Sequence, residues 1–364
     1  MTQSLQGKIH KTMATTLAVS LLLGAGLGPV FAAAAPANAQ EKPPAVKGEP
    51  ATPETGDTKT QLLEMTGGKR VKVVWNQETS PTNPKLKVRY YDSKKGAVVD
   101  LPFPEAGSAP LFTMDGRRIV ISAGKTPAER LVLMYDTETG KLTELAKGLE
   151  NNVMALWQDP KTKRDWVFVN DMGDKNQQWN QPAGTIYKYP VDKPEQRKLV
   201  WDRTSSQIYL SLSADGTRAC LNPTWGNIGE LKFALNADGS VDQTKSVFTK
   251  FGGGCWPSMA PDDSYRLFRL EGSHTFITMH DADNASKRVI PINEMLTGKD
   301  KGMPCWLTRW STHPRYITCQ APNRVKDARI WVGKFDEKFT KIEKWVRIAT
   351  ADDAHCWQSH SWVE

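Results

Sequence analysis

Three Cys-Trp pairs are the most distinctive group of chemically capable residues in the sequence: Cys255-Trp256, Cys305-Trp306 and Cys356-Trp357. A tryptophan offers a large flat face on which a sugar ring or a peptide side chain can stack. Histidine and arginine stand near these pairs, and they can donate hydrogen bonds to a polar ligand. The predicted ligand-binding residues are therefore Trp256, Trp306, Trp357, His355, Arg309 and His360.

Packing and metal binding are the alternatives for the same residues. Tryptophan often packs between structural repeats, and cysteine is among the most buried residue types. Three thiolates and His355 have the right ligand types for a tetrahedral metal site. However, the spacing does not resemble a C-x-x-C pair, and thiols tend to oxidise in an oxidising compartment. No metal, cofactor or catalytic residue is therefore predicted.

The five cysteines allow at most two disulfides. A hairpin turn centred near Thr312–His313 would place Cys305 opposite Cys319. Directly opposed residues of antiparallel strands have Cα atoms about 4.5–5.5 Å apart, a separation that permits bridging. We therefore predict a Cys305–Cys319 disulfide.

A sequence repeat must position all of these residues. One unit recurs six times: a strand of β-branched and aromatic residues, a turn rich in Asp, Gly, Asn or Lys, and another short strand. Corresponding positions follow one another at steps of 44 to 55 residues, at Tyr91, Tyr135, Tyr189, Leu235, His280 and Phe335. Four-stranded propeller blades recur at about 40–50 residues. The predicted fold is an all-β, six-bladed β-propeller of four-stranded antiparallel blades.

The two ends of the repeat region predict a closed ring. The region begins near residues 68–75 with the second strand of a blade, so the innermost strand of that blade is missing. Near the C-terminus, Cys356–Trp362 matches the innermost strands that begin at Cys255 and Cys305. This last strand is expected to pair with Val71–Trp75 and so remove the exposed sheet edges. The Cys-Trp pairs then fall in the fifth, sixth and first blades, around one mouth of the channel.

The turns between strands resemble the P-x-W-S-P-D-G-K/R-x-I-A-F signature of TolB-like, PD40-type (WD40-like) propellers. The similar segments are Pro257–Asp263, Leu212–Gly216 and Phe112–Gly116, and residues 131–140 resemble the family's I-Y-V-M-D-x-x-T-G strand and turn. The resemblance covers about residues 68–364. Trp310–Pro314 and Trp157–Pro160 depart from the pattern.

This resemblance implies a periplasmic or secreted binding module for a carbohydrate or a peptide or protein ligand, bound at a channel mouth. The alternative is a metal-assisted lyase that resembles oligogalacturonate lyase, in which Arg309, His355 and His360 would supply charged and basic groups. A prolyl-oligopeptidase type is excluded, since the sequence has no G-x-S-x-G motif.

The N-terminus predicts export. Residues 1–39 combine a basic start, an apolar stretch and the A-x-A site Ala37–Ala39, as in a cleaved signal peptide. Residues 40–66 are expected to form a disordered, proline-rich tether, and residues 67–364 the propeller. After removal of Lys8 and Lys11 the formal charge falls from +8 to +6. The basic residues are scattered among acids, so neither nucleic-acid binding nor membrane insertion after cleavage is predicted.

Overall fold

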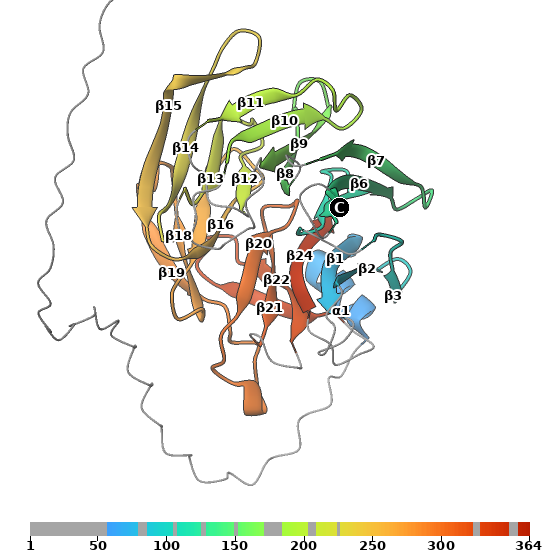
Figure 1. Ribbon diagram of the computed structural model, residues 1–364. Helices are drawn as coiled ribbons and strands as arrows, with labels where there is room; N and C mark the ends of the chain where they lie inside the picture. Colours follow the sequence, from blue (N-terminus) through green and yellow to red (C-terminus); the bar gives the residue numbers. More distant parts are fainter. Residues whose placement is uncertain are drawn as a thin grey trace, which may run out of the picture. The chain divides into compact units, whose positions relative to one another are not determined.

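Six antiparallel sheets of four strands each make up the repeat region of the computed structural model (Figure 1). The structure describes residues 57–78, 86–104, 108–124, 129–148, 152–170, 184–202, 209–223, 226–322, 328–348 and 356–364. Each sheet is one blade. The predicted six-bladed propeller is confirmed.

Each blade has one innermost strand, on the propeller axis, followed by three strands in order towards the outside. Blade 1 consists of β24 (Cys356–Val363), β1 (Val71–Glu78), β2 (Leu86–Asp92) and β3 (Ala97–Asp100). Blade 2 consists of β4 (Leu111–Phe112), β5 (Arg118–Ala123), β6 (Leu131–Asp136) and β7 (Leu142–Lys147). Blade 3 consists of β8 (Asn152–Gln158), β9 (Asp165–Asn170), β10 (Ile186–Pro190) and β11 (Lys198–Trp201). Blade 4 consists of β12 (Leu210–Leu212), β13 (Arg218–Leu221), β14 (Ile228–Leu235) and β15 (Val241–Gly252). Blade 5 consists of β16 (Cys255–Met259), β17 (Leu267–Leu270), β18 (Phe276–His280) and β19 (Lys287–Pro291). Blade 6 consists of β20 (Trp306–Trp310), β21 (Tyr316–Ala321), β22 (Arg329–Phe335) and β23 (Ile342–Arg347).

All six marker positions of the sequence repeat lie on the third strand of their blade. The second and third strands are rich in β-branched and aromatic residues because both of their faces are covered by neighbouring blades. β1, for example, is buried from Val71 through Gln77. The outermost strands are more exposed to solvent. On β19 only Ile290 is buried, and Val289 is exposed.

β24 closes the ring as predicted. It runs antiparallel to β1, with Val71 opposite Val363 and Val74 opposite His360. The innermost strands contact one another in the cyclic order β24, β4, β8, β12, β16, β20 and back to β24. The N-terminal and C-terminal parts of the repeat region therefore share one sheet.

Two tryptophans fasten a blade to the turn of the next blade. Trp362, at the end of β24, donates from Nε1 to the carbonyl oxygen of Met114 at 3.0 Å, and Gly116 lies against its ring. Trp157 on β8 bonds in the same way to Ala214 at 2.9 Å and covers Gly216. The Asp-Gly turns therefore need glycine for this close approach as well as for their left-handed backbone.

A short helix, α1 (Thr58–Thr66), lies within the last part of the segment expected to be a tether. It begins after Asp57, whose side chain caps it, and ends at Gly67 in the left-handed conformation. Leu62 and Met65 are buried in the core of blades 1 and 6. Residues 1–39 and 40–56 lie outside the described residues, so the predicted signal peptide and most of the tether remain predictions. Within the described part of the chain, no helix is long and apolar enough to span a membrane.

Candidate functional site

A cavity of about 220 Å³ lies on the propeller axis. Every innermost strand contributes to its wall, including Phe112 on β4, Leu156 on β8, Leu212 on β12, Met259 on β16 and His360 on β24. Met114, Ala214, Pro261 and Thr312, which follow these strands, also line it. The cavity is therefore at the mouth formed by the turns that follow the innermost strands, opposite the mouth where the Cys-Trp pairs begin.

One position of the innermost strands carries a polar side chain in four successive blades. Its occupants on β12, β16, β20 and β24 are Ser211, Ser258, Arg309 and His360, and all four line the cavity. Ser211 Oγ accepts a hydrogen bond from the backbone N–H of Met259 at 2.6 Å, and Ser258 Oγ accepts one from Trp310 at 3.0 Å. These bonds join neighbouring innermost strands around the ring.

His360 continues this series across the ring closure. Its Nδ1 accepts from the backbone N–H of Phe112 at 3.0 Å. Burial, with a smaller contribution from the charge of Arg309, lowers the pKa of His360 to about 3. The imidazole is therefore neutral at physiological pH, and because Nδ1 is an acceptor, the proton is on Nε2.

Arg309 interrupts the series. A guanidinium has no acceptor atom, so it cannot receive a backbone N–H from the next blade. Its Nη2 instead donates to the carbonyl oxygen of Met154 at 3.1 Å, on the opposite blade. The guanidinium also lies 5.7 Å from the ring centre of Tyr209. Arg309 is only 7 % exposed, and burial lowers its pKa.

No carboxylate lines the cavity among the described residues. Lys163 lies at its mouth and Arg309 deeper within it, while most other lining side chains are aliphatic or aromatic. Besides Ser211 and Ser258, two further lining hydroxyls have partners in the protein: Ser213 Oγ donates to Asp215 and Ser311 Oγ donates to the carbonyl of His313. The cavity therefore combines apolar walls with positive charge.

The structure divides the predicted ligand-binding set. Arg309 and His360 line the cavity, whereas Trp256 and Trp306 do not. Trp256 and Trp306 instead pack against each other with ring centres 4.8 Å apart and planes inclined by 46°, and the ring of His274 lies 5.3 Å and 5.1 Å from their ring centres. Trp256 is 2 % exposed. His355 and the side chain of Trp357 lie outside the described residues.

A β-bulge follows the start of each of these strands. Between Cys255 and Ser258, between Trp306 and Arg309, and between Trp357 and Ser359, the innermost strand has one more residue than its partner. Trp256, Leu307 and Gln358 take positive φ values of 42°, 53° and 27° there. A bulge redirects the side chains that follow it. These bulges therefore determine to which side of the blade the side chains of Ser258, Arg309 and His360 point.

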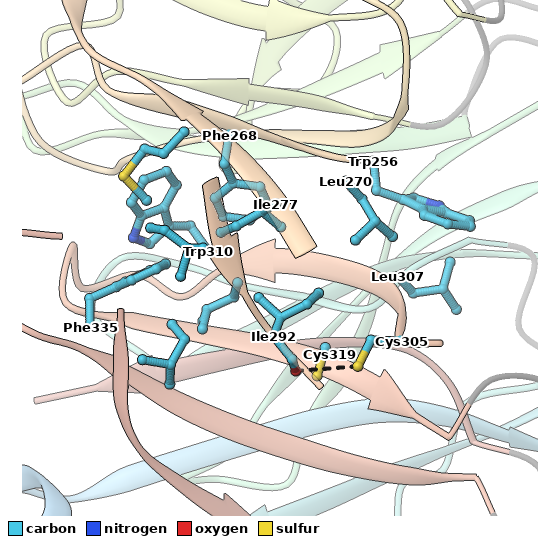
Figure 2. Packing of buried hydrophobic residues seen from close by; sticks show 14 of the residues in the cluster. Trp256, Phe268, Leu270, Ile277, Ile292, Cys305, Leu307, Trp310, Cys319 and Phe335 are labelled. Carbon is cyan, nitrogen blue, oxygen red and sulfur yellow. Dashed lines mark hydrogen bonds between the residues drawn. The ribbon is translucent and has the colours of Figure 1, made fainter. Parts of the chain in front are cut away.

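Cys305 and Cys319 lie side by side as free thiols rather than as the expected disulfide (Figure 2). Cys305 Sγ donates to the carbonyl oxygen of Ile292 at 3.3 Å. Burial, and then the neighbouring Cys305 thiol, raise the pKa of Cys319 well above its usual range. Cys220, Cys255 and Cys356 are also buried and form no disulfide. Among the described residues, no group of three or more His, Cys, Asp or Glu side chains is arranged to hold a metal ion.

Most cavity residues were not predicted from the sequence, among them Phe112, Ser211, Ser258, Trp310 and Lys163. A signal for two of them was present, since Ser211 and Ser258 stand at the same distance before the turns at Asp215 and Asp262 as Arg309 stands before the turn near His313. Comparison of this position across the repeats would have identified the four polar side chains on β12, β16, β20 and β24.

No protein-family model matches the sequence, and no curated protein matches it. Solved structures do match the fold. TolB from Acinetobacter baumannii superposes with a TM-score of 0.55 at 13% identity, covering 82% of this chain and 69% of that one. A chain of a nidogen/laminin complex superposes with a TM-score of 0.52 at 10% identity, covering 80% and 98%. The chain has a TolB-like six-bladed β-propeller fold. The superpositions establish the fold of the TolB-like propeller. At identities this low they do not identify its ligand, which has to be inferred from the cavity.

Proposed function

We propose that this TolB-like propeller is an exported binding protein that takes a peptide or a segment of a partner protein into the axial cavity. The observation that supports the proposal is the cavity itself, which is lined by all six blades and has mainly apolar walls. Concave, largely apolar sites with a few placed polar groups are typical of ligand binding. Export is part of the proposal because of the A-x-A site at Ala37–Ala39.

A peptide is favoured over a carbohydrate by the wall chemistry. A sugar has many hydroxyl groups, each of which needs a hydrogen-bond partner once it is desolvated. Several lining hydroxyls already have partners within the protein, and the remaining surface near Leu156, Leu212 and Met259 is apolar. Such walls suit hydrophobic side chains.

The polysaccharide lyase alternative finds little support in His360. A lyase needs a general base whose pKa is near the working pH. The pKa of His360 is about 3, and its Nδ1 is occupied by the backbone of Phe112. Binding without catalysis is therefore the function we propose.

The test is a binding screen of the purified protein against peptides and oligosaccharides, with and without EDTA. Trp157 and Trp310 line the cavity, so intrinsic fluorescence reports its occupation. A matched pair of variants locates the site: Ala214→Trp narrows the cavity mouth, whereas Ala285→Trp adds the same side chain on an exposed turn of blade 5.

We expect peptide binding that survives EDTA, is lost in Ala214→Trp and is retained in Ala285→Trp. Circular dichroism of both variants controls for folding. Binding that both variants retain would place the ligand elsewhere, and EDTA-sensitive release of unsaturated sugars would establish the lyase instead.

A further inference from the structure

Arg309 has the environment of a binding residue rather than of a structural one. The equivalent Ser211, Ser258 and His360 each hold the next blade through its backbone N–H, and Arg309 cannot do so. Among the described residues, the only hydrogen bond of its guanidinium is the one to Met154. A guanidinium carries five N–H donors, so most of its capacity is unused.

Burying this charge is unfavourable for the protein alone. A charged group taken out of water is strongly unfavourable unless it is paired, and a single carbonyl partner compensates only a fraction of that cost. The nearby Tyr209 ring adds an attraction of the cation–π type. Because no carboxylate of the described residues lines the cavity, a ligand carboxylate could supply the charged partner that the wall does not provide to Arg309.

The other polar groups around Arg309 suit the same partner. His360 is neutral and presents an Nε2–H donor, since its Nδ1 already accepts from Phe112. Lys163 at the mouth adds a second positive charge on the route into the cavity. An anion in this position meets donors and cations and no competing negative side chain of the described wall.

We propose that Arg309 receives the carboxylate of a ligand whose adjoining part is apolar, namely the free C-terminus of a peptide with a hydrophobic last residue. Arginine pairs with carboxylates in a bidentate manner, which adds direction to the attraction. The apolar walls formed by Phe112, Leu212 and Met259 would enclose the last side chain. This inference rests on the proposed function, because it assigns the chemistry of the bound end.

The experiment uses random hexapeptides without Asp or Glu, so that the C-terminus is their only carboxylate. Each is prepared as the free acid and as the C-terminal amide and titrated against the purified protein by tryptophan fluorescence. A second arm compares 3-phenylpropanoate with 3-phenylpropanamide, which separates a small apolar acid from a peptide. The variants are Arg309→Met, Arg309→Lys and the control Arg117→Met, an exposed arginine of the blade 2 turn paired with Asp136.

We expect free acids to bind at least ten-fold more tightly than their amides. Arg309→Met should lower the affinity for the acid to that for the amide and leave the amide unaffected. Arg309→Lys should fall between the two, and Arg117→Met should behave as the wild type. A thermal melt of each variant confirms that it is folded.

The other outcomes are distinguishable. Peptides that bind equally as acids and amides would overturn the role of Arg309 and leave the proposed function standing. Binding of 3-phenylpropanoate without any peptide would support the carboxylate site and overturn the peptide source. A protein that binds no member of either arm would refute both proposals.

Discussion

Arg309 and Met154 touch across the axis of the propeller, with Nη2 of the arginine 3.1 Å from the carbonyl oxygen of the methionine. They belong to β20 and β8, the innermost strands of opposite blades. Met154 is the extra residue of a β-bulge, since Val153 pairs with Val169 and Ala155 pairs with Phe168. A bulged residue is left outside the regular ladder. Its carbonyl oxygen is therefore free to accept from the arginine.

This relationship predicts that Arg309 is retained at the expense of stability. Replacement of a buried charge by an apolar side chain of similar volume is often neutral or stabilising. Arg309→Met should therefore leave the melting temperature unchanged or raise it by a few degrees. Calorimetry of the ligand-free protein measures the shift. A clear fall would mean that the contact with Met154 acts as a structural tie, contrary to our view of the residue.

His360 predicts a specific pH dependence of stability. Its pKa in the folded protein is about 3, below the ordinary value near 6.5 of an unfolded chain. Between these values the unfolded state binds the extra proton, so the free energy of unfolding rises with pH over that window and is lost as the pH falls. The contribution has a slope of at most about 1.4 kcal/mol per pH unit for one group.

His360→Asn tests this contribution. The amide oxygen of asparagine can accept from the backbone N–H of Phe112 in place of Nδ1 and does not titrate. Urea unfolding at intervals from pH 4 to pH 8 should give a shallower pH dependence for the variant than for the wild type. Parallel curves would show that protonation of His360 does not couple to folding.

Cys305 and Cys319 provide a redox prediction. Both thiols are fully buried, and burial holds the pKa of Cys319 above its ordinary range, which suppresses the reactive thiolate. We expect iodoacetamide to label neither residue until the reduced protein is unfolded. Mass spectrometry of a non-reduced digest measures the labelling, and modification of either thiol in the folded protein, or a 305–319 disulfide, would contradict this expectation.

The fold was predictable because blade repeats place similar residues at similar structural positions. Tyr91 and Tyr135 share the third-strand position, and Val71–Trp75 lacked an inner partner that Cys356–Trp362 could supply. These are long patterns, in which many residues agree. Helix α1 was not predicted because its nine residues include few apolar ones. Its stability comes from burial of Leu62 and Met65.

The cavity was harder to predict because side-chain direction depends on the bulges. In a regular strand, residues alternate between two faces, so an extra residue reverses the facing of everything after it. Trp306 and Arg309 are three apart in sequence but oppose Gln320 and Thr318, which are two apart. The spacing of the Cys-Trp pairs to Arg309 and His360 could not reveal this shift.

Trp306 tests the division between the aromatic cluster and the cavity. Its ring packs on Trp256 and His274 and does not line the cavity. Trp306→Ala should therefore destabilise the protein by about 2–4 kcal/mol, in the range of large-to-small substitutions at a partly buried site. The affinity of the folded fraction for peptide should be unchanged. A loss of affinity without loss of stability would show that the ligand binds at the channel mouth where the Cys-Trp pairs lie.

Gly116 tests how the ring is fastened. Its φ is 65°, and a Cβ at this position would lie 2.2 Å from Cδ2 of Trp362, whose indole bonds to Met114. Gly239 has a similar φ of 75° but open space around it. Both alanine variants suffer the left-handed backbone penalty of about 1 kcal/mol. Only Gly116→Ala must also displace the tryptophan of the closing strand, which adds about 1–3 kcal/mol of overpacking. Urea unfolding of the two variants gives the difference. Equal losses would show that Trp362 yields without cost and that the closure of blade 1 does not depend on this contact.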